Sequence, residues 1–158
     1  MTPSPTILVL GLGNTLLTDD GIGVHVIETL KAELASRSGV DVRDGGTLGL
    51  SLLPDVESAD ALILVDAAEV GGSAGDVRCF VGADMDRQLF GVKRTAHEVA
   101  AADLLDAAAL TGRKPERRAL VEVQPASTEW GLAPTGAVQS AIPTACAMVR
   151  ELIERWQA

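Results

Sequence analysis

Residues 6–23 read TILVLGLGNTLLTDDGIG and give the strongest indication of the fold class. Thr6 to Leu10 form a short apolar run rich in β-branched residues, which predicts a buried strand. The run ends in a glycine-containing loop. From Gly21 onward, apolar residues recur at helical spacing, namely at Ile22, Val26, Ile27, Leu30 and Leu34. A buried strand, a glycine loop and an amphipathic helix in this order are typical of an α/β protein.

The rest of the chain repeats this alternation of strands and helices. Further strands are expected at 40–43, 61–65, 76–81 and 119–123, the one at 76–81 at an edge of the sheet. Helices are expected at 48–56, 98–110 and 137–156, the last with a kink or a fresh start at Pro143. Residues 82–96 and 124–134 are expected to be loops. The pattern predicts one α/β domain over residues 1–158 with a mostly parallel sheet.

The composition excludes several classes of protein. Hydrophobic residues make up 47% of the chain, enough for a packed core and too many for a disordered chain. The formal net charge of −9 repels a phosphate backbone, so we expect no nucleic-acid partner. We see neither a signal peptide nor an apolar run of membrane-spanning length, so we expect a cytoplasmic protein without membrane contact. Cys79 and Cys146 are the only cysteines and form no disulfide framework.

The loop after the first strand carries two adjacent carboxylates, Asp19 and Asp20. A dinucleotide-binding fingerprint would need glycine where this chain has Leu16, and no phosphate-loop sequence follows. Two carboxylates attract a cation and repel a phosphate. An aspartate at a helix start is also a common N-cap, and Asp20 stands where the cap is expected. The sequence leaves open which of the two caps the helix and which binds a ligand.

Two further candidates stand at the same predicted edge of the sheet, because parallel sheets bind ligands beyond the carboxyl ends of their strands. Asp66 directly follows the apolar run 61–65, and His97 directly precedes the Ala-rich helix. Asp66 could instead cap a segment or pair with a basic residue, and His97 could have a surface role only. Together, Asp20, Asp66 and His97 supply two carboxylates and one imidazole, a set that suits a borderline divalent metal with open positions.

Other catalytic schemes find little support. The residues GGSAG at 71–75 match Gly-x-Ser-x-Gly, but they mark a turn before the strand expected at 76–81 and not the strand-to-helix elbow of a serine nucleophile. The chain has no His-Glu-x-x-His pair. A cysteine nucleophile could in principle pair with His97. Cys146 stands among Ala145, Ala147 and Met148 in a predicted helix, which favours a buried structural thiol instead.

Five segments resemble, in order, the motifs of the hydrogenase maturation endopeptidases. They are GLGNTLLTDDGIG at 11–23, DGGTLG at 44–49, LILVDA at 62–67, TAHE at 95–98 and GLAPT at 131–135. The resemblance spans residues 7–156. It departs from the family pattern at Asp20, where many members have glutamate, and at Ala100, where glycine is frequent.

The resemblance implies a fold, an activity and a partner. The fold would have three layers, with a twisted, mostly parallel five-stranded sheet flanked by helices. The protein would be an endopeptidase similar to the aspartic type. It would remove the C-terminal extension from the precursor of a nickel-iron hydrogenase large subunit. Nickel would arrive with the precursor and serve as the recognition element. The catalytic and metal-contacting positions of the family carry over onto Asp20, Asp66 and His97, and we expect a monomer.

The resemblance suggests a mechanism that leaves alternatives open. Asp20, Asp66 and His97 would complete the coordination of the precursor's nickel, so that the metal or its water acts on the scissile carbonyl. The substrate chain would dock on Gly45, Gly46 and Thr47. Whether a carboxylate acts as general base is left open. A second hypothesis is a nickel-checking or metallochaperone module that cuts nothing. A third, a nucleotide-binding enzyme, is disfavoured by Leu16.

Overall fold

The structure is a computed structural model that describes residues 6–91 and 96–158, with the backbone only for residues 96–100. It contains a five-stranded sheet in the order β2-β1-β3-β5-β4. The strands are β1 (Ile7–Leu12), β2 (Val40–Gly46), β3 (Ala61–Ala67), β4 (Val77–Val81) and β5 (Arg117–Val123). β4 lies at one edge, antiparallel to β5, while β1 pairs in parallel with β2 and β3, and β3 with β5. The prediction of a mostly parallel sheet with residues 76–81 at its edge is confirmed.

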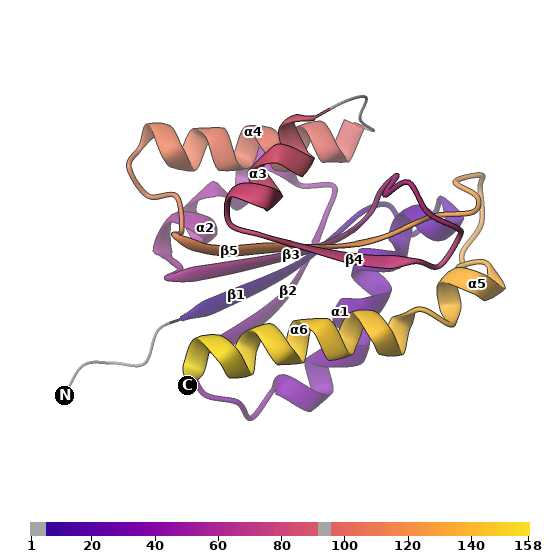
Figure 1. Ribbon diagram of the computed structural model, residues 1–158, viewed down its shortest axis with the longest axis horizontal. Helices are drawn as coiled ribbons and strands as arrows, with labels where there is room; N and C mark the ends of the chain where they lie inside the picture. Colours follow the sequence, from indigo (N-terminus) through magenta and orange to yellow (C-terminus); the bar gives the residue numbers. More distant parts are fainter. Residues whose placement is uncertain (1–5, 92–95) are drawn as a thin grey trace.

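Helices cover both faces of the sheet, which gives the three predicted layers (Figure 1). One face carries α1 (Ile22–Leu34) and α6 (Ile142–Gln157), and the other carries α2 (Leu53–Ser58), α3 (Ala83–Phe90) and α4 (Ala96–Leu110). Short 3-10 turns, η1 (Thr18–Gly21) and η2 (Gly49–Leu52), lead into α1 and α2. A single-turn helix, α5 (Gly136–Gln139), precedes α6.

Each face of the sheet has its own apolar core, because successive side chains of a strand point to opposite faces. Val9, Ile63 and Val121 pack with α1 and α6 on one face. Leu10, Leu64 and Leu120 pack on the other face with side chains of α2, α3 and α4. Since these strands are buried on both sides, they read as continuous apolar runs in the sequence.

One helix was not predicted from the sequence. Residues 83–90 form α3, although the whole stretch 82–96 was expected to be a loop. Only Met85 and Leu89 of this helix are buried, so its apolar stripe is too narrow to stand out among charged residues. The expected fresh start at Pro143 is confirmed, because α5 ends at Gln139 and Pro143 stands in the first turn of α6, where a proline costs no hydrogen bond.

The first turn of α1 lies directly against the ends of β1 and β3. A Cβ atom on Gly23 would come within 2.2 Å of the Val65 carbonyl oxygen and 2.4 Å of the Leu12 carbonyl oxygen. Only glycine allows this approach, and it places η1 beside the sheet edge where both strands end. Among the described residues, no helix is both long and apolar enough to cross a membrane.

Candidate active site

The candidate site lies at the edge of the sheet where the parallel strands end, at the right of Figure 1. After β1 the chain runs outward to β2 and then returns to β3 on the opposite side of β1. Open α/β sheets bind ligands at such a switch point. Asp20 follows β1 and Asp66 stands near the end of β3, so the two predicted carboxylates flank the switch point. Both are buried, with 6% and 1% of their surface exposed.

Asp19 holds two loops together. Its Oδ2 accepts hydrogen bonds from the backbone amides of Ala126 at 2.8 Å and Ser127 at 3.0 Å. Its Oδ1 accepts one from the amide of Thr135 at 2.7 Å, and the Thr135 hydroxyl donates to the same carboxylate. The side chain is completely buried. The loop after β1 is therefore fixed to the loop after β5 by one carboxylate.

The environment of Asp19 keeps it ionised. Burial alone would raise the pKa of this carboxyl group. The amides of Ser127, Thr135 and Ala126 and the Thr135 hydroxyl together outweigh burial and lower the pKa below its ordinary value of 3.8. Both oxygens are thus engaged by protein donors, which leaves Asp19 a structural role.

Asp20 has different surroundings. Its Oδ2 accepts a hydrogen bond of 3.0 Å from the backbone amide of Asn14, within the same loop. The expectation that Asp20 caps α1 is wrong, because η1 intervenes and Gly21 occupies the N-cap position without any side-chain cap. The Asp20 carboxylate instead closes the loop that leads from β1 to the switch point.

Asp66 lies within β3 rather than after it. Its Oδ1 accepts a 2.8 Å hydrogen bond from the backbone amide of Ala67. Because Asp66 is two residues beyond Leu64, its side chain points to the face of the sheet that α3 and α4 cover.

A further buried carboxylate, which the sequence did not single out, stands beside Asp66. Glu122 on β5 is the cross-strand partner of Asp66 and has only 1% of its surface exposed. Side chains of partner residues on neighbouring strands share a face, so Glu122 also points toward α3. The Gln88 amide nitrogen of α3 donates a 2.8 Å hydrogen bond to Glu122 Oε1. The sequence signal that could have identified Glu122 is a glutamate in the otherwise apolar run ALVEV, because a charged residue in a buried strand is unusual.

His97 is placed by its backbone only. It lies in the first turn of α4, the helix that covers the Asp66 face of the sheet. The position of its imidazole lies outside the described residues, and so does any contact it makes. Among the side chains that the structure describes, no group of three His, Cys, Asp or Glu residues could hold a metal ion.

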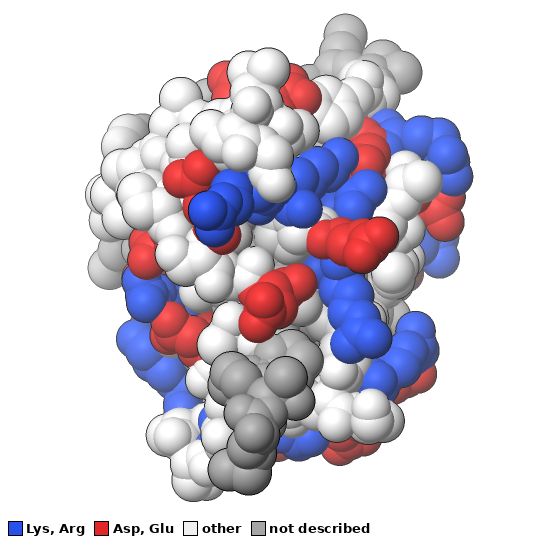
Figure 2. All heavy atoms as spheres, turned by 90° about the vertical axis from the view of Figure 1, so that its left-hand side faces the viewer, with Lys and Arg blue, Asp and Glu red and all other residues white. Residues whose placement is uncertain are grey.

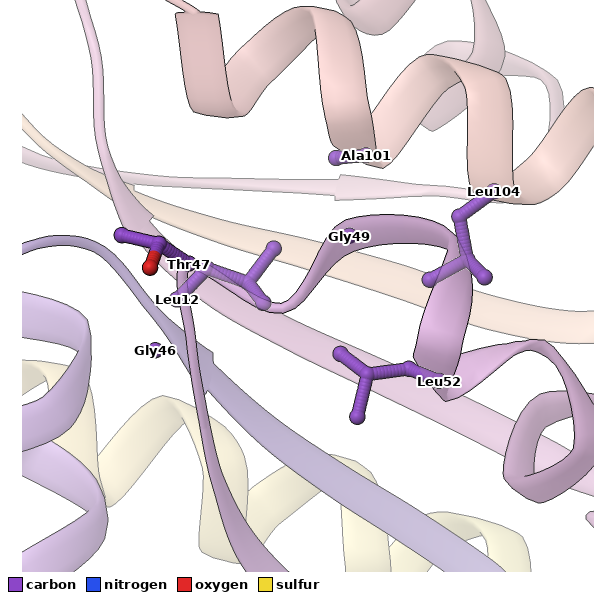
Figure 3. Close-up of a pocket in the computed structure, with 7 residues that line it drawn as sticks. All are labelled: Leu12, Gly46, Thr47, Gly49, Leu52, Ala101 and Leu104. Carbon is purple, nitrogen blue, oxygen red and sulfur yellow. The ribbon is translucent and has the colours of Figure 1, made fainter.

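The predicted docking loop lines a small pocket beside the switch point. Gly46 ends β2, and its carbonyl accepts a 2.9 Å hydrogen bond from the Gly13 amide, which joins the loops after β1 and β2. The pocket has a volume of about 20 Å³ and lies between this loop and α4 (Figure 3). It is lined by Leu12, Gly46, Thr47, Gly49, Leu52, Ala101 and Leu104. Gly45 lies close behind, since a Cβ atom there would come within 2.9 Å of the Leu12 side chain.

The cysteines do not take part in the site. Cys146 is buried in α6, as predicted, and burial raises the pKa of its thiol. A raised pKa disfavours the thiolate that a nucleophile needs. Cys79 lies on β4, at the outer edge of the sheet.

Similarity to known proteins agrees with this architecture. Residues 24–152 match the family model described as hydrogenase maturation protease. The chain is 38% identical to the hydrogenase 2 maturation protease of Escherichia coli strain K12 over 149 residues, covering 92% of this chain and 91% of that protein. It is 34% identical to the hydrogenase expression/formation protein HupD of Rhizobium leguminosarum bv. viciae, with 98% and 77% covered. For HupM of Azotobacter chroococcum, at 38% identity, the match covers 80% of this chain and 60% of that relative.

Solved structures give the same result. The hydrogenase-maturating endopeptidase HybD of Escherichia coli has a TM-score of 0.87 at 33% identity, with 95% of this chain and 93% of that chain covered. HybD of Thermococcus kodakarensis, a [NiFe] hydrogenase maturation protease, has a TM-score of 0.80 at 25% identity, with 93% and 98% covered. The sheet edge that carries Asp20 and Asp66 thus occurs in a protein that belongs to the hydrogenase maturation protease family and is an endopeptidase.

Proposed function

We propose that this endopeptidase removes the C-terminal extension from the nickel-loaded precursor of a nickel-iron hydrogenase large subunit. The precursor would carry the nickel to the switch point, where Asp20, Asp66 and His97 contact it. Carboxylate and imidazole groups are suitable ligands for a divalent metal of this kind. We propose further that the enzyme is a monomer that acts in the cytoplasm. Its two unpaired cysteines are consistent with a reducing compartment.

The main support for this proposal is that the two adjacent aspartates have different partners. Asp19 is fully engaged by donors of the loop after β5, so its oxygens serve the fold. Asp20 accepts a hydrogen bond from Asn14 through Oδ2 and belongs to the same loop after β1. Because both oxygens of Asp19 are engaged by the loop after β5, we favour Asp20 over Asp19 as the metal contact, a choice that the sequence left open.

In this proposal the chain positions the scissile peptide and the precursor supplies the metal. Nickel in the precursor would act as a Lewis acid toward the scissile carbonyl. Asp20 and Asp66 would hold the loaded precursor by their negative charge at the edge of the sheet. Burial strengthens such an interaction, because little water screens it.

The tail of the precursor would lie along the loop formed by Gly45, Gly46 and Thr47. The pocket beside this loop is apolar, since Thr47 alone among its lining residues has a polar side chain. Its volume of about 20 Å³ accommodates a group no larger than a methyl or a single water. We expect a small aliphatic group of the tail to enter it, and the glycine backbone to contact the substrate chain.

The alternative is a nickel-checking or metallochaperone module that uses the same residues without cutting. The two functions are separated by incubating the purified protein with nickel-loaded and nickel-free precursor and following intact mass over time. Release of one defined C-terminal peptide, from the loaded precursor only, is the expected result. Stoichiometric binding of the loaded precursor without any mass change would support the alternative instead. Cleavage of the nickel-free precursor at an equal rate would refute the role of the metal.

A further inference from the structure

Large apolar side chains are exposed at the sheet edge that carries the candidate site. Trp130 has 80% of its surface exposed, Leu132 77% and Leu16 49%. Exposed apolar residues are common singly, but a group of them on one surface is typical of a protein interface. Tryptophan in particular is enriched among the residues that dominate binding energy.

The three side chains come from two loops that are hydrogen-bonded to each other. Leu17 and Gly131 form an isolated parallel bridge. The Gly131 amide donates to the Leu16 carbonyl at 2.9 Å, and the Thr18 amide donates to the Gly131 carbonyl at 3.0 Å. Gly131 stands between Trp130 and Leu132, so Leu16 lies against the segment that carries both. We call Leu16, Trp130 and Leu132 the apolar rim.

Hydrogen bonds to the Asp19 carboxylate fix the backbone of the loop that carries Trp130 and Leu132. Asp19, which follows Leu16 by three residues, binds the backbone of Ala126, Ser127 and Thr135 on either side of Trp130 and Leu132. A fully buried ionised carboxylate is costly unless several donors compensate it. Here it fixes a loop whose large apolar side chains face solvent. Loops ordered before binding lose less entropy when a partner docks.

The opposite edge of the molecule has a different character. Figure 2 shows the side where the parallel strands begin, and basic and acidic side chains alternate over much of it. Ion pairs there include Asp86 with Arg118 and Lys114, and Arg43 with Asp41 and Asp55. The Arg118 guanidinium lowers the pKa of Asp86 to about 2, with a further contribution from Lys114. Such mixed charge is typical of a solvated surface.

We infer that the apolar rim is a docking surface for the folded body of the protein substrate, separate from the groups that contact its scissile tail. This inference rests on the proposed function, since it takes the hydrogenase large-subunit precursor as the occupant. A protein that presents a peptide bond to Asp20 must pass close to the rim, because Leu16 and Asp20 belong to the same loop. The matching surface of the precursor is apolar and surrounds the base of its tail.

The test compares the variant carrying Trp130→Ser and Leu132→Ser with wild type and with Leu110→Ser. Leu110 is a matched control, because it is 88% exposed but lies at the far end of α4. Initial rates of tail release are measured against the concentration of nickel-loaded precursor. For the double variant we expect KM to rise by roughly tenfold or more, with kcat within about twofold of wild type and an unchanged melting temperature. Leu110→Ser is expected to match wild type in both constants.

The outcomes separate the rim from the endopeptidase reaction. An unchanged KM in the double variant, or an equal rise in Leu110→Ser, would overturn the docking surface while leaving the cleavage reaction intact. If wild type binds the precursor without cutting it, a Kd that rises tenfold in the double variant supports the rim although the proposed function fails. If wild type does not bind the precursor at all, the precursor is not the partner that occupies the rim, and the inference is overturned. Concentration-dependent dimerisation that the double variant abolishes would assign the rim to a second copy of this chain and overturn the inference.

Discussion

Asp19 and Asp20 are neighbours in the sequence, yet their carboxylates contact different parts of the molecule. Asp19 bonds to residues as distant as Thr135, 116 positions along the chain. Asp20 bonds to Asn14, six positions away. The sequence predicted that one of the pair has a structural role and the other a ligand role. It could not assign them, because the partners of Asp19 are backbone amides of a distant loop and have no signature in the sequence.

Replacement of Asp19 tests the structural role. Asp19→Ala leaves the amides of Ala126, Ser127 and Thr135 without their acceptor, so we expect the free energy of unfolding at pH 7 to fall by about 3 kcal/mol. The measurement is urea denaturation, with Asp19→Asn as a control that keeps one carbonyl oxygen. An Asp19→Ala variant as stable as wild type would contradict this role.

The same residue predicts a dependence on pH. The pKa of Asp19 is lower in the folded protein than its ordinary value of 3.8. Its ionised form therefore stabilises the fold above that value, and the contribution is lost as the pH falls through the lower folded pKa. Between pH 5 and 2 we expect the stability of wild type to fall more steeply than that of Asp19→Ala.

Glu122 could not be recognised as a neighbour of Asp66 from the sequence. The run ALVEV predicts a strand correctly, but a single glutamate in it gives no indication of its neighbours. Only the strand order places Glu122 beside Asp66, because β5 follows β3 in the sheet and not in the chain. Whether His97 joins these carboxylates remains a prediction, since its side chain lies outside the described residues.

At the scale of elements, the contact of α1 with the ends of β1 and β3 positions the site. Gly23 allows this contact, since any Cβ atom there would overlap the carbonyl oxygens of Val65 and Leu12. The sequence predicted the helix and its apolar stripe, because both follow from local spacing. It did not predict the close approach of Gly23 to two strands, which depends on the sheet pairing.

Gly23→Ala tests this contact. The added methyl must push the first turn of α1 away from the sheet, so we expect a loss of about 3 kcal/mol of stability by urea denaturation. Tail release should also slow by at least roughly tenfold in the folded fraction, because η1 and Asp20 move with the helix. Gly136→Ala is the matched control. No atom lies within 4 Å of its added methyl, so stability should stay equal or rise by up to about 1 kcal/mol.

At the scale of the whole molecule, the strand order decides which loops meet. Alternating strands and helices sufficed to predict the three layers, because the central strands β1 and β3 are buried along their whole length and so must be covered by helices on both faces. The order β2-β1-β3-β5-β4 places the switch point between β1 and β3. Sequence alone did not fix this order. The resemblance to the family implied Asp20, Asp66 and His97 as site residues. The strand order explains why Asp20 and Asp66 lie at the same edge of the sheet.

We propose that Asp20 and Asp66 form the part of the enzyme that acts on the nickel-loaded precursor. The most direct measurement is the initial rate of tail release by wild type, Asp20→Asn and Asp66→Asn, with melting temperatures recorded for each. We predict that both variants stay folded and release the tail at least about 100-fold more slowly, since amide oxygens carry no charge for the metal. A folded Asp66→Asn variant that releases the tail at the wild-type rate would refute a role of Asp66 in tail release.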